Sequence, residues 1–171
     1  MSRRKAEEEI ALGNVTVNGR KAEIGQKITP GKDYIVYQGK TVVPSGKKYY
    51  IKLNKPRGFV STMSDEKGRK CVADLVSKVP ERVYPIGRLD LDSEGLLLMT
   101  NDGELANAMM HPSSEIEKTY VVKVRLAPSE EQIHLLNQSM EIDGYRIKPC
   151  RVTCPEPTIP NKLRFVLKEG R

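Results

Sequence analysis

The sequence predicts an α+β protein with two parts. The first is a small basic module over residues 1–43, and the second is a body over residues 49–171 with a large, mainly antiparallel sheet flanked by helices. Three observations predict this organisation: positive charge is concentrated at the front, turn dipeptides interrupt short alternating segments, and strand-like and helix-like patterns alternate afterwards. The polar stretch Pro44–Lys48 between the two parts has the composition of a linker.

The charge is distributed unevenly along the chain. Residues 1–57 hold 13 Lys and Arg against 5 Asp and Glu, whereas residues 58–171 hold 16 against 17. Such asymmetry is typical of a phosphate-binding module joined to a neutral body. A lysine-rich surface that only improves solubility is the alternative.

The front module is predicted to hold one helix and small hairpins. Ser2 precedes the segment RRKAEEEIALG, in which Ala6, Ile10 and Ala11 share one helical face, and Gly13 offers a stop. Turn dipeptides then divide the alternating segments that follow at Asn18-Gly19, Pro30-Gly31 and Gln38-Gly39.

The body is predicted to alternate strands and helices. The strands are expected near Tyr49–Asn54, Phe59–Met63, Val83–Ile86, Leu96–Thr100, Thr119–Leu126, Tyr145–Val152 and Leu163–Leu167. The helices are expected over Cys71–Val79, Gly103–Met110 and Ser129–Met140. Ser129 and Gln132 have the spacing of a capping box.

Composition excludes several classes of protein. The three cysteines are an odd number without a paired framework, which indicates a reducing compartment, and Cys150 and Cys154 lack the further ligands of a zinc site. No apolar run approaches the ~20 residues that cross a membrane, and no signal peptide is visible. We therefore expect a cytoplasmic protein without a zinc site or a membrane contact. We also expect a monomer without a metal or a cofactor.

Acidic residues surround the apolar run Leu96–Met99. Asp92 and Glu94 suit the turn before it, and Asp102 suits the N-cap of the helix after it. Asp90 is left without a local structural task, which makes it a candidate for catalysis, although a turn or an ion pair would also explain it. Asp90 and Asp92 have the spacing of a pair of Mg²⁺ ligands, but no third carboxylate has a fitting spacing.

Four segments carry a resemblance to a known family. They are GRLDLDSEGLLLMTNDG at 87–103, LNKPRG at 53–58, EKTYVV at 117–122 and LKEGR at 167–171. Together they resemble the bacterial ribosomal-RNA pseudouridine synthases that modify single uridines, and SRRKAEEEIALGNVTVNG resembles the alpha-L RNA-binding domain that precedes their catalytic domain. The resemblance implies an alpha-L domain over 1–43, a linker over 44–48 and a catalytic domain over 49–171. The family pattern has one more helix before this chain and continues past Arg171, so we expect a longer whole protein.

The resemblance also implies roles for individual residues. Asp90 is the expected catalyst, and Arg171, in the family's Glu-Gly-Arg position, is its expected cationic partner. Tyr120 is expected to stack on the uracil after the base leaves its helix, and Arg88 is expected to support the displaced nucleotide. The chemistry requires no redox change, metal or cofactor.

The expected partner is ribosomal RNA, either free or in a pre-ribosomal particle. The residues expected to bind it are Arg3, Arg4, Lys5, Lys55, Arg57, Arg88 and Lys118. Each has an ordinary alternative: Tyr120 suits the core of a sheet, and Lys55 to Gly58 suit a turn between strands. Two other functions remain open at this point, namely a non-catalytic RNA-binding or ribosome-assembly protein and a metal-dependent nuclease built on Asp90 and Asp92.

The charge of the front module leads to a first prediction. Removing residues 1–43 should flatten the slope of log affinity for RNA against log salt concentration, because fewer phosphates are neutralised. Filter binding of an RNA fragment over a series of salt concentrations measures the slope. An unchanged slope would mean that the positive charge serves solubility alone.

Overall fold

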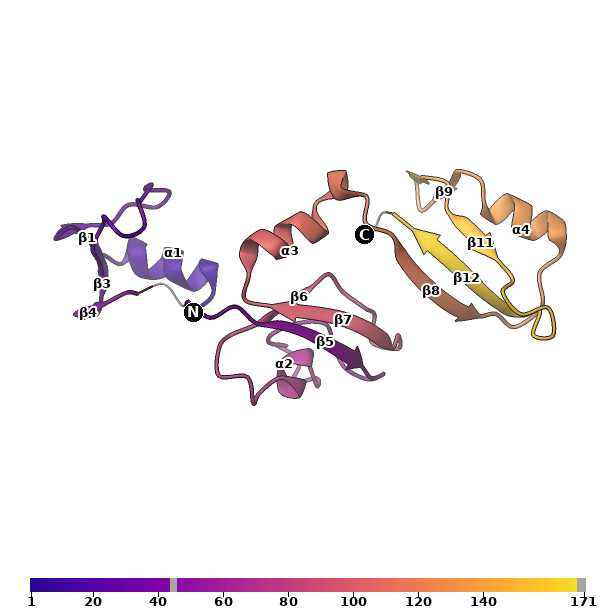
Figure 1. Ribbon diagram of the computed structural model, residues 1–171, viewed down its shortest axis with the longest axis horizontal. Coiled ribbons are helices and arrows are strands. Elements are labelled where there is room, and N and C mark those ends of the chain that lie inside the picture. The colour runs from indigo at the N-terminus through magenta and orange to yellow at the C-terminus, as the bar shows by residue number, and fades with distance from the viewer. Residues whose placement is uncertain (44–45, 169–171) are drawn as a thin grey trace. The chain divides into compact units, whose positions relative to one another are not determined.

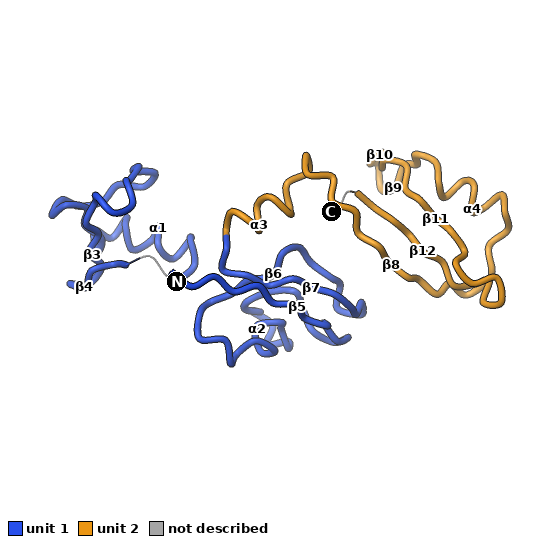
Figure 2. Tube along the Cα trace, in the orientation of Figure 1, with its two compact units in different colours: residues 1–102 blue, residues 103–171 orange. Residues whose placement is uncertain are grey.

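The computed structural model describes residues 1–43 and 46–168 (Figure 1). It divides into two compact units, Met1–Asp102 and Gly103–Arg171 (Figure 2). Two residues of the expected linker, 44 and 45, and the expected site residue Arg171 lie outside the described residues.

The predicted first helix is confirmed. Helix α1 (Arg3–Ala11) begins after Ser2, whose Oγ accepts a hydrogen bond from the Lys5 backbone N–H at 3.2 Å. This bond satisfies one of the free N–H groups of the first turn. The helix ends at Ala11, and its C-cap Leu12 directly precedes Gly13.

The predicted hairpins at Asn18-Gly19 and Gln38-Gly39 are also confirmed. They join β1 (Val15–Val17) to β2 (Arg20–Lys21) and β3 (Ile35–Tyr37) to β4 (Lys40–Thr41), in an antiparallel sheet of order β2-β1-β3-β4. The φ angles of the turn residues are 51° and 80° in the first hairpin and 48° and 74° in the second. Gly adopts such positive angles without strain and Asn tolerates them, and the angles match the twist of a two-residue hairpin.

Glu9 connects α1 to the segment that leads into this sheet. Its side chain is buried, and its carboxylate accepts a hydrogen bond from Asn14 Nδ2 at 2.8 Å and lies 3.2 Å from Lys5 Nζ. Hydrogen bonds from Asn14 and then Lys5 hold the pKa of Glu9 below its ordinary value. The Asn14 carbonyl accepts a hydrogen bond from the Gln38 N–H at 3.4 Å, which continues the connection into the second hairpin.

A second antiparallel sheet, of order β5-β7-β6, lies in the same unit. It consists of β5 (Tyr50–Lys55), β6 (Tyr84–Ile86) and β7 (Gly95–Thr100), with Tyr50 opposite Thr100 and Lys55 opposite Gly95. The apolar run Leu96–Met99 is only half buried, because alternate residues face opposite sides of the sheet. Leu97 and Met99 are 3% and 1% exposed and enter the core with Val72, Val76 and Val83, whereas Leu96 is 66% exposed.

The segment between β5 and β6 differs from the prediction. The helix expected over Cys71–Val79 is the shorter α2 (Val72–Leu75), with Cys71 as its N-cap. The strand expected over Phe59–Met63 is wrong, since its only ladder contact among the described residues is a bridge between Val60 and Cys71. Ser61 instead uses its side chain to bond the Leu89 backbone, which replaces strand pairing at this point.

The second unit begins with α3 (Gly103–Met110), as predicted, and the short 3-10 helix η1 (Pro112–Ser114). Its main sheet has the order β11-β12-β8, from β8 (Lys118–Lys123), β11 (Arg151–Thr153) and β12 (Lys162–Leu167). Helix α4 (Glu130–Leu136) has the predicted capping box of Ser129 and Gln132. It is shorter than predicted because the Asn137 side chain exchanges hydrogen bonds of 3.1 and 2.9 Å with the backbone of Val152.

Two predictions about strand pairing were wrong. The stretch expected as one strand near Tyr145–Val152 contains β10 (Tyr145–Ile147), which pairs with β9 (Met140–Ile142), and the separate strand β11. The large sheet expected in the body is replaced, over residues 46–168, by three smaller antiparallel sheets. The mixture of helices and antiparallel sheets is as predicted.

None of the helices in the described parts of the chain is long and apolar enough to cross a membrane.

The buried carboxylate of Glu9 leads to a pH prediction. A lowered folded pKa means that this stabilisation is complete above the unfolded pKa of about 4.3 and is lost as the pH falls through the folded pKa. Glu9→Gln should remove this component of the acid sensitivity of residues 1–43. Amide hydrogen exchange of these residues at several pH values measures it, with Glu7→Gln as the control, because the Glu7 side chain is 42% exposed and that of Glu9 only 8%. An identical pH profile in Glu9→Gln and the wild type would contradict the prediction.

Candidate active site

The loop between β6 and β7 is held by the segment that follows β5. Ser61 Oγ donates a hydrogen bond to the Leu89 carbonyl at 2.7 Å and accepts one from the Leu89 N–H at 3.0 Å. The Gly58 N–H donates to the Leu91 carbonyl at 2.8 Å. These bonds fix the loop backbone on both sides of Asp90.

Lys55 supplies the strongest of these attachments. Its side chain is fully buried, with 0% exposure, and its Nζ donates hydrogen bonds to the carbonyls of Pro56 at 3.2 Å, Asp90 at 2.8 Å and Ser93 at 2.7 Å. An ammonium has three donors, so its hydrogen-bonding capacity is used completely. Burial lowers the pKa of Lys55, while the negative charges of Asp90 and Asp92 oppose that shift.

This position of Lys55 differs from the expected contact with an RNA phosphate. A fully buried ammonium with three carbonyl partners presents no surface to RNA. The LNKPRG segment therefore contributes to the site by shaping the loop that carries Asp90.

The hydrogen bonds from Lys55 turn the carbonyls of Asp90 and Ser93 towards the interior, and the acidic side chains of the loop lie on the surface. Asp90, Asp92 and Glu94 are all exposed. Within residues 1–43 and 46–168, the carboxylates of Asp90 and Asp92 have no hydrogen bond, so the turn contact expected for Asp92 is not observed. The turn is closed by the backbone instead, with the Ser93 N–H donating to the Asp90 carbonyl at 3.2 Å.

Two arginines belong to the same pair of segments. Arg88 is exposed and precedes Asp90 by two residues. Arg57 is also exposed, and its Nε lies 3.6 Å from Glu94 Oε2. An exposed ion pair of this length contributes little to stability, so the guanidinium of Arg57 can exchange Glu94 for another anion.

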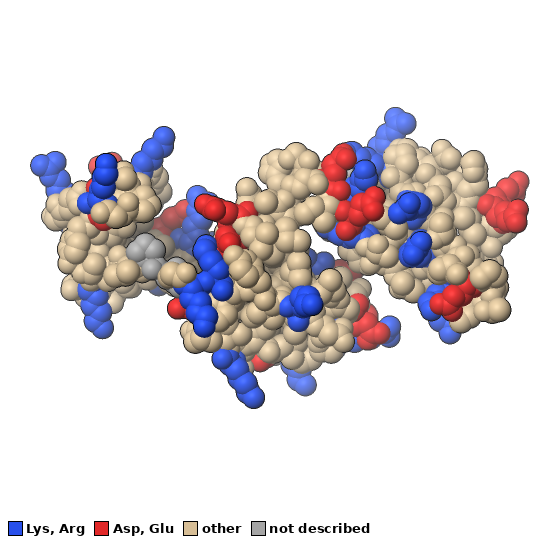
Figure 3. Space-filling model, viewed as in Figure 1, with Lys and Arg blue, Asp and Glu red and all other residues tan. Residues whose placement is uncertain are grey.

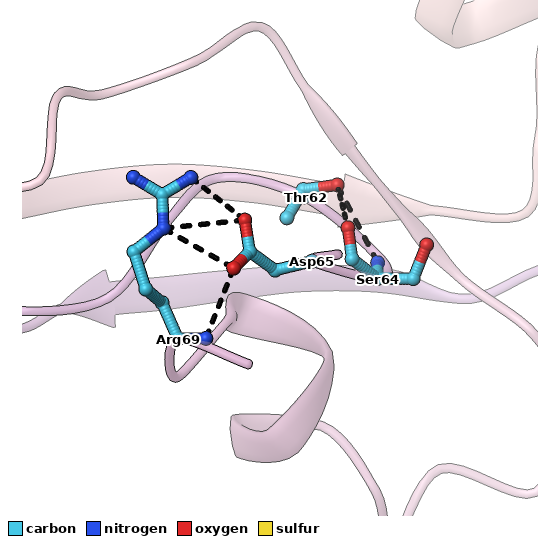
Figure 4. A network of polar contacts seen from close by, with 4 residues as sticks. All are labelled: Thr62, Ser64, Asp65 and Arg69. Atoms are coloured by element: carbon cyan, nitrogen blue, oxygen red, sulfur yellow. Dashed lines mark hydrogen bonds and ion pairs between the residues drawn. The ribbon is translucent and has the colours of Figure 1, made fainter. Parts of the chain in front are cut away.

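A polar loop continues directly from Ser61 (Figure 4). The carboxylate of Asp65 accepts hydrogen bonds from Arg69 Nη2 at 2.7 Å and from the Arg69 backbone N–H at 2.9 Å. These contacts, the guanidinium first, lower the pKa of Asp65 to about 2. Thr62 Oγ1 donates to the Ser64 carbonyl at 2.8 Å beside them. The loop that follows Ser61 in the chain is therefore held by hydrogen bonds among its own residues.

Tyr120 and Lys118 lie on β8, in the second unit. Tyr120 is half-buried and stands opposite Phe165 of β12, on the sheet face that also buries Leu163 and Val152. Lys118 is half-buried and its Nζ donates to the Ile116 carbonyl at 3.2 Å. The position of Tyr120 thus fits a core aromatic as well as the expected stacking role.

The three basic residues expected to bind RNA in the front module lie in the first turn of α1. Arg3 Nε is 3.1 Å from Glu7, and Lys5 Nζ is 3.4 Å from Glu8 and 3.2 Å from Glu9, whereas Arg4 is exposed. Basic side chains project from several sides of this module (Figure 3). Part of the positive charge of α1 is therefore compensated within the helix.

The structure brings together only some of the residues expected in the site. Asp90, Arg88, Lys55 and Arg57 share the two connected segments, whereas the remaining expected residues lie elsewhere in the chain. Over residues 1–43 and 46–168, no group of three or more His, Cys, Asp or Glu side chains is arranged to hold a metal ion.

Comparison with known proteins identifies the family. Residues 49–166 match the family model described as RNA pseudouridylate synthase. The chain belongs to the RNA pseudouridylate synthase family. Ribosomal large subunit pseudouridine synthase B of Bacillus subtilis strain 168 is 48% identical over 174 residues, which cover 99% of this chain and 70% of that protein.

A second relative agrees with this assignment, and a solved structure shares the fold. A dual-specificity RNA pseudouridine synthase of Escherichia coli K12 is 38% identical over 171 residues, which cover 99% of this chain and 57% of that protein. A crystal structure of a pseudouridylate synthase superimposes with a TM-score of 0.65 at 24% identity, over 100% of this chain and 73% of that one. At that identity the superposition shows the fold alone.

The contact of Ser61 with Leu89 could not be predicted from the sequence of this pseudouridylate synthase. A strand was expected over Phe59–Met63, and the pattern of a strand does not indicate that a serine side chain bonds a distant part of the backbone. The only local signal is the break of regular alternation after Gly58, which cannot name a partner 28 positions away in the chain.

The buried ammonium leads to a stability prediction. Lys55→Met should lower the free energy of unfolding of this pseudouridylate synthase by about 2–4 kcal/mol, because three buried carbonyls lose their donors. Lys52→Met, on the exposed face of the same strand, should change it by less than about 0.5 kcal/mol. Urea unfolding followed by circular dichroism measures both. Equal urea midpoints for the two variants would show that the Lys55 contacts do not stabilise the fold.

Proposed function

We propose that this protein isomerises a uridine of ribosomal RNA to pseudouridine, with the carboxylate of Asp90 as the catalyst. Membership of the family supports the reaction, and relatives named for action on ribosomal RNA support the substrate. The observation that carries the role of Asp90 is the loop geometry: its backbone is fixed at several points while its carboxylate is exposed.

The reaction breaks the bond between ribose C1′ and uracil N1, turns the base, and forms a bond between C1′ and C5. The proton on C5 is released and N1 gains one, so product and substrate are isomers and no electrons are exchanged. The carboxylate of Asp90 acts by attack on C1′ or on C6, or by removal of a ribose proton. Each of these steps needs open access to the carboxylate, which the exposed Asp90 provides.

The target base must leave its stack before Asp90 can reach it. We assign stacking on the displaced uracil to Tyr120, and support of the displaced nucleotide to Arg88, whose side chain is exposed beside Asp90. Arg171 is the proposed cation that keeps Asp90 ionised in the complex with RNA. The family match over residues 49–166 supports the assignments of Tyr120 and Arg88, which lie within it, whereas that of Arg171 rests on the resemblance of the segment LKEGR.

Residues outside the loop are proposed to hold the RNA. Arg57, Arg3, Arg4, Lys5 and Lys118 are the candidates for phosphate contacts. We assign residues 1–43 to an alpha-L RNA-binding domain, 44–48 to a linker and 49–171 to the catalytic domain. The family match that begins at residue 49 supports this division.

Replacement of Asp90 tests the proposal. Asp90→Asn keeps the size of the side chain but removes its negative charge, so the rate should fall by about 10³-fold or more. RNA affinity should stay the same or rise slightly, because a carboxylate repels phosphate. Release of tritium from uridine labelled at C5, in transcripts of small- and large-subunit ribosomal RNA, measures the rate.

Asp92→Asn is the matched control, since Asp92 is exposed on the same loop and its carboxylate has no hydrogen bond within the described residues. It should change the rate far less than Asp90→Asn and should leave stability within about 0.5 kcal/mol. A near wild-type rate in Asp90→Asn together with an inactive Asp92→Asn would assign catalysis to the other aspartate. Unchanged rates in both variants would reject a catalytic role for this loop.

A further inference from the structure

Ser61 holds the backbone directly before Asp90, and we propose that it is a positioning residue for the reaction; this inference rests on the proposed role of Asp90. Ser61 is 7% exposed. Its hydroxyl donates to the Leu89 carbonyl at 2.7 Å and accepts from the Leu89 N–H at 3.0 Å. One side chain therefore occupies both backbone hydrogen-bonding groups of Leu89.

The geometry of the peptide group transmits this contact to Asp90. The Leu89 carbonyl belongs to the planar group that contains the Asp90 nitrogen, so fixing that carbonyl fixes the plane before the Asp90 Cα. The plane after it contains the Asp90 carbonyl, which accepts hydrogen bonds from Lys55 Nζ at 2.8 Å and the Ser93 N–H at 3.2 Å. With both planes held, φ and ψ of Asp90 are fixed and only its side-chain torsions stay free.

Ser61 is itself anchored to the body of the domain. The N–H of its neighbour Val60 donates to the Lys70 carbonyl at 2.9 Å, and the Val60 carbonyl accepts from the Val72 N–H at 3.0 Å. The Leu89 side chain packs against the core cluster that includes Val72. The Ser61 hydroxyl thus links the segment after β5 to the loop between β6 and β7, and both segments contact the same core. Its two hydrogen bonds fix how these segments align at Leu89, the residue before Asp90.

The consequence is an effect on the chemical step rather than on RNA binding. A catalytic group displaced by about 1 Å can lose about 10²-fold in rate, because the reacting atoms no longer meet in the productive geometry. Ser61 is buried and presents no surface to RNA, so its loss should leave substrate binding unchanged. We therefore expect Ser61→Ala to lower kcat and to leave KM unchanged.

The chain offers a matched control at the opposite end of β7. Thr100 is 0% exposed, and its Oγ1 donates to the Tyr49 carbonyl at 2.6 Å and accepts from the Asp102 N–H at 2.9 Å. Thr100→Val and Ser61→Ala each remove one buried hydroxyl with one donated and one accepted backbone bond. Of these two residues, only Ser61 is hydrogen-bonded to the loop that carries Asp90.

The experiment compares both variants in the full chain, by thermal unfolding and by tritium release from ribosomal RNA transcripts labelled at C5 of uridine. Both should lower the unfolding temperature by similar amounts. kcat should fall about 10-fold or more in Ser61→Ala and stay within about twofold of the wild type in Thr100→Val. Equal kcat values in the two variants would overturn the positioning role.

Two further variants make every outcome decisive. If Ser61→Ala does not fold, Ser61→Cys replaces it, since a thiol fills the space but is a weak donor and acceptor. A kcat several-fold below the wild type then supports the proposal, and an unchanged kcat overturns it. Asp90→Asn, measured in parallel, separates the two hypotheses. A fully active Asp90→Asn rejects the proposed function, whereas an inactive Asp90→Asn with a normal Ser61 variant rejects only the inference about Ser61.

Discussion

The geometry of the candidate site depends on the burial of one positive charge. Moving an ammonium out of water costs several kcal/mol unless hydrogen bonds replace its hydration. Lys55 is compensated by three backbone carbonyls, two of which belong to the loop between β6 and β7. The loop must therefore turn these carbonyls inward, and Asp90, Asp92 and Glu94 lie exposed around them. This arrangement explains why acidic side chains lie on the surface directly before the apolar strand β7.

The sequence predicted well the features that short-range contacts determine. The hairpins at Asn18-Gly19 and Gln38-Gly39, the cap at Ser2 and the capping box of Ser129 and Gln132 each depend on residues a few positions apart. The type of each element in the second unit was also largely predictable. Helix ends were less so, since α4 stops where Asn137 bonds the backbone of Val152, a partner 15 positions away.

The features that the sequence did not predict depend on distant partners. Lys55 lies in a basic motif that suggests a surface, yet its partners Asp90 and Ser93 follow 35 and 38 positions later. Ser61 was placed in a strand because its bond to Leu89 has no local signature. Asp90 could be singled out as a candidate from the sequence, but only the structure shows how its backbone is held.

The attachments of the Asp90 loop have an evolutionary consequence. Lys55, Ser61 and Gly58 all bond to backbone carbonyls, which every amino acid possesses. Mutations at the outward positions, such as Leu91 or Glu94, can therefore accumulate without disturbing the path of the chain. A protein built on this loop can change the surface around its aspartate while the hydrogen bonds that hold the backbone beneath stay constant.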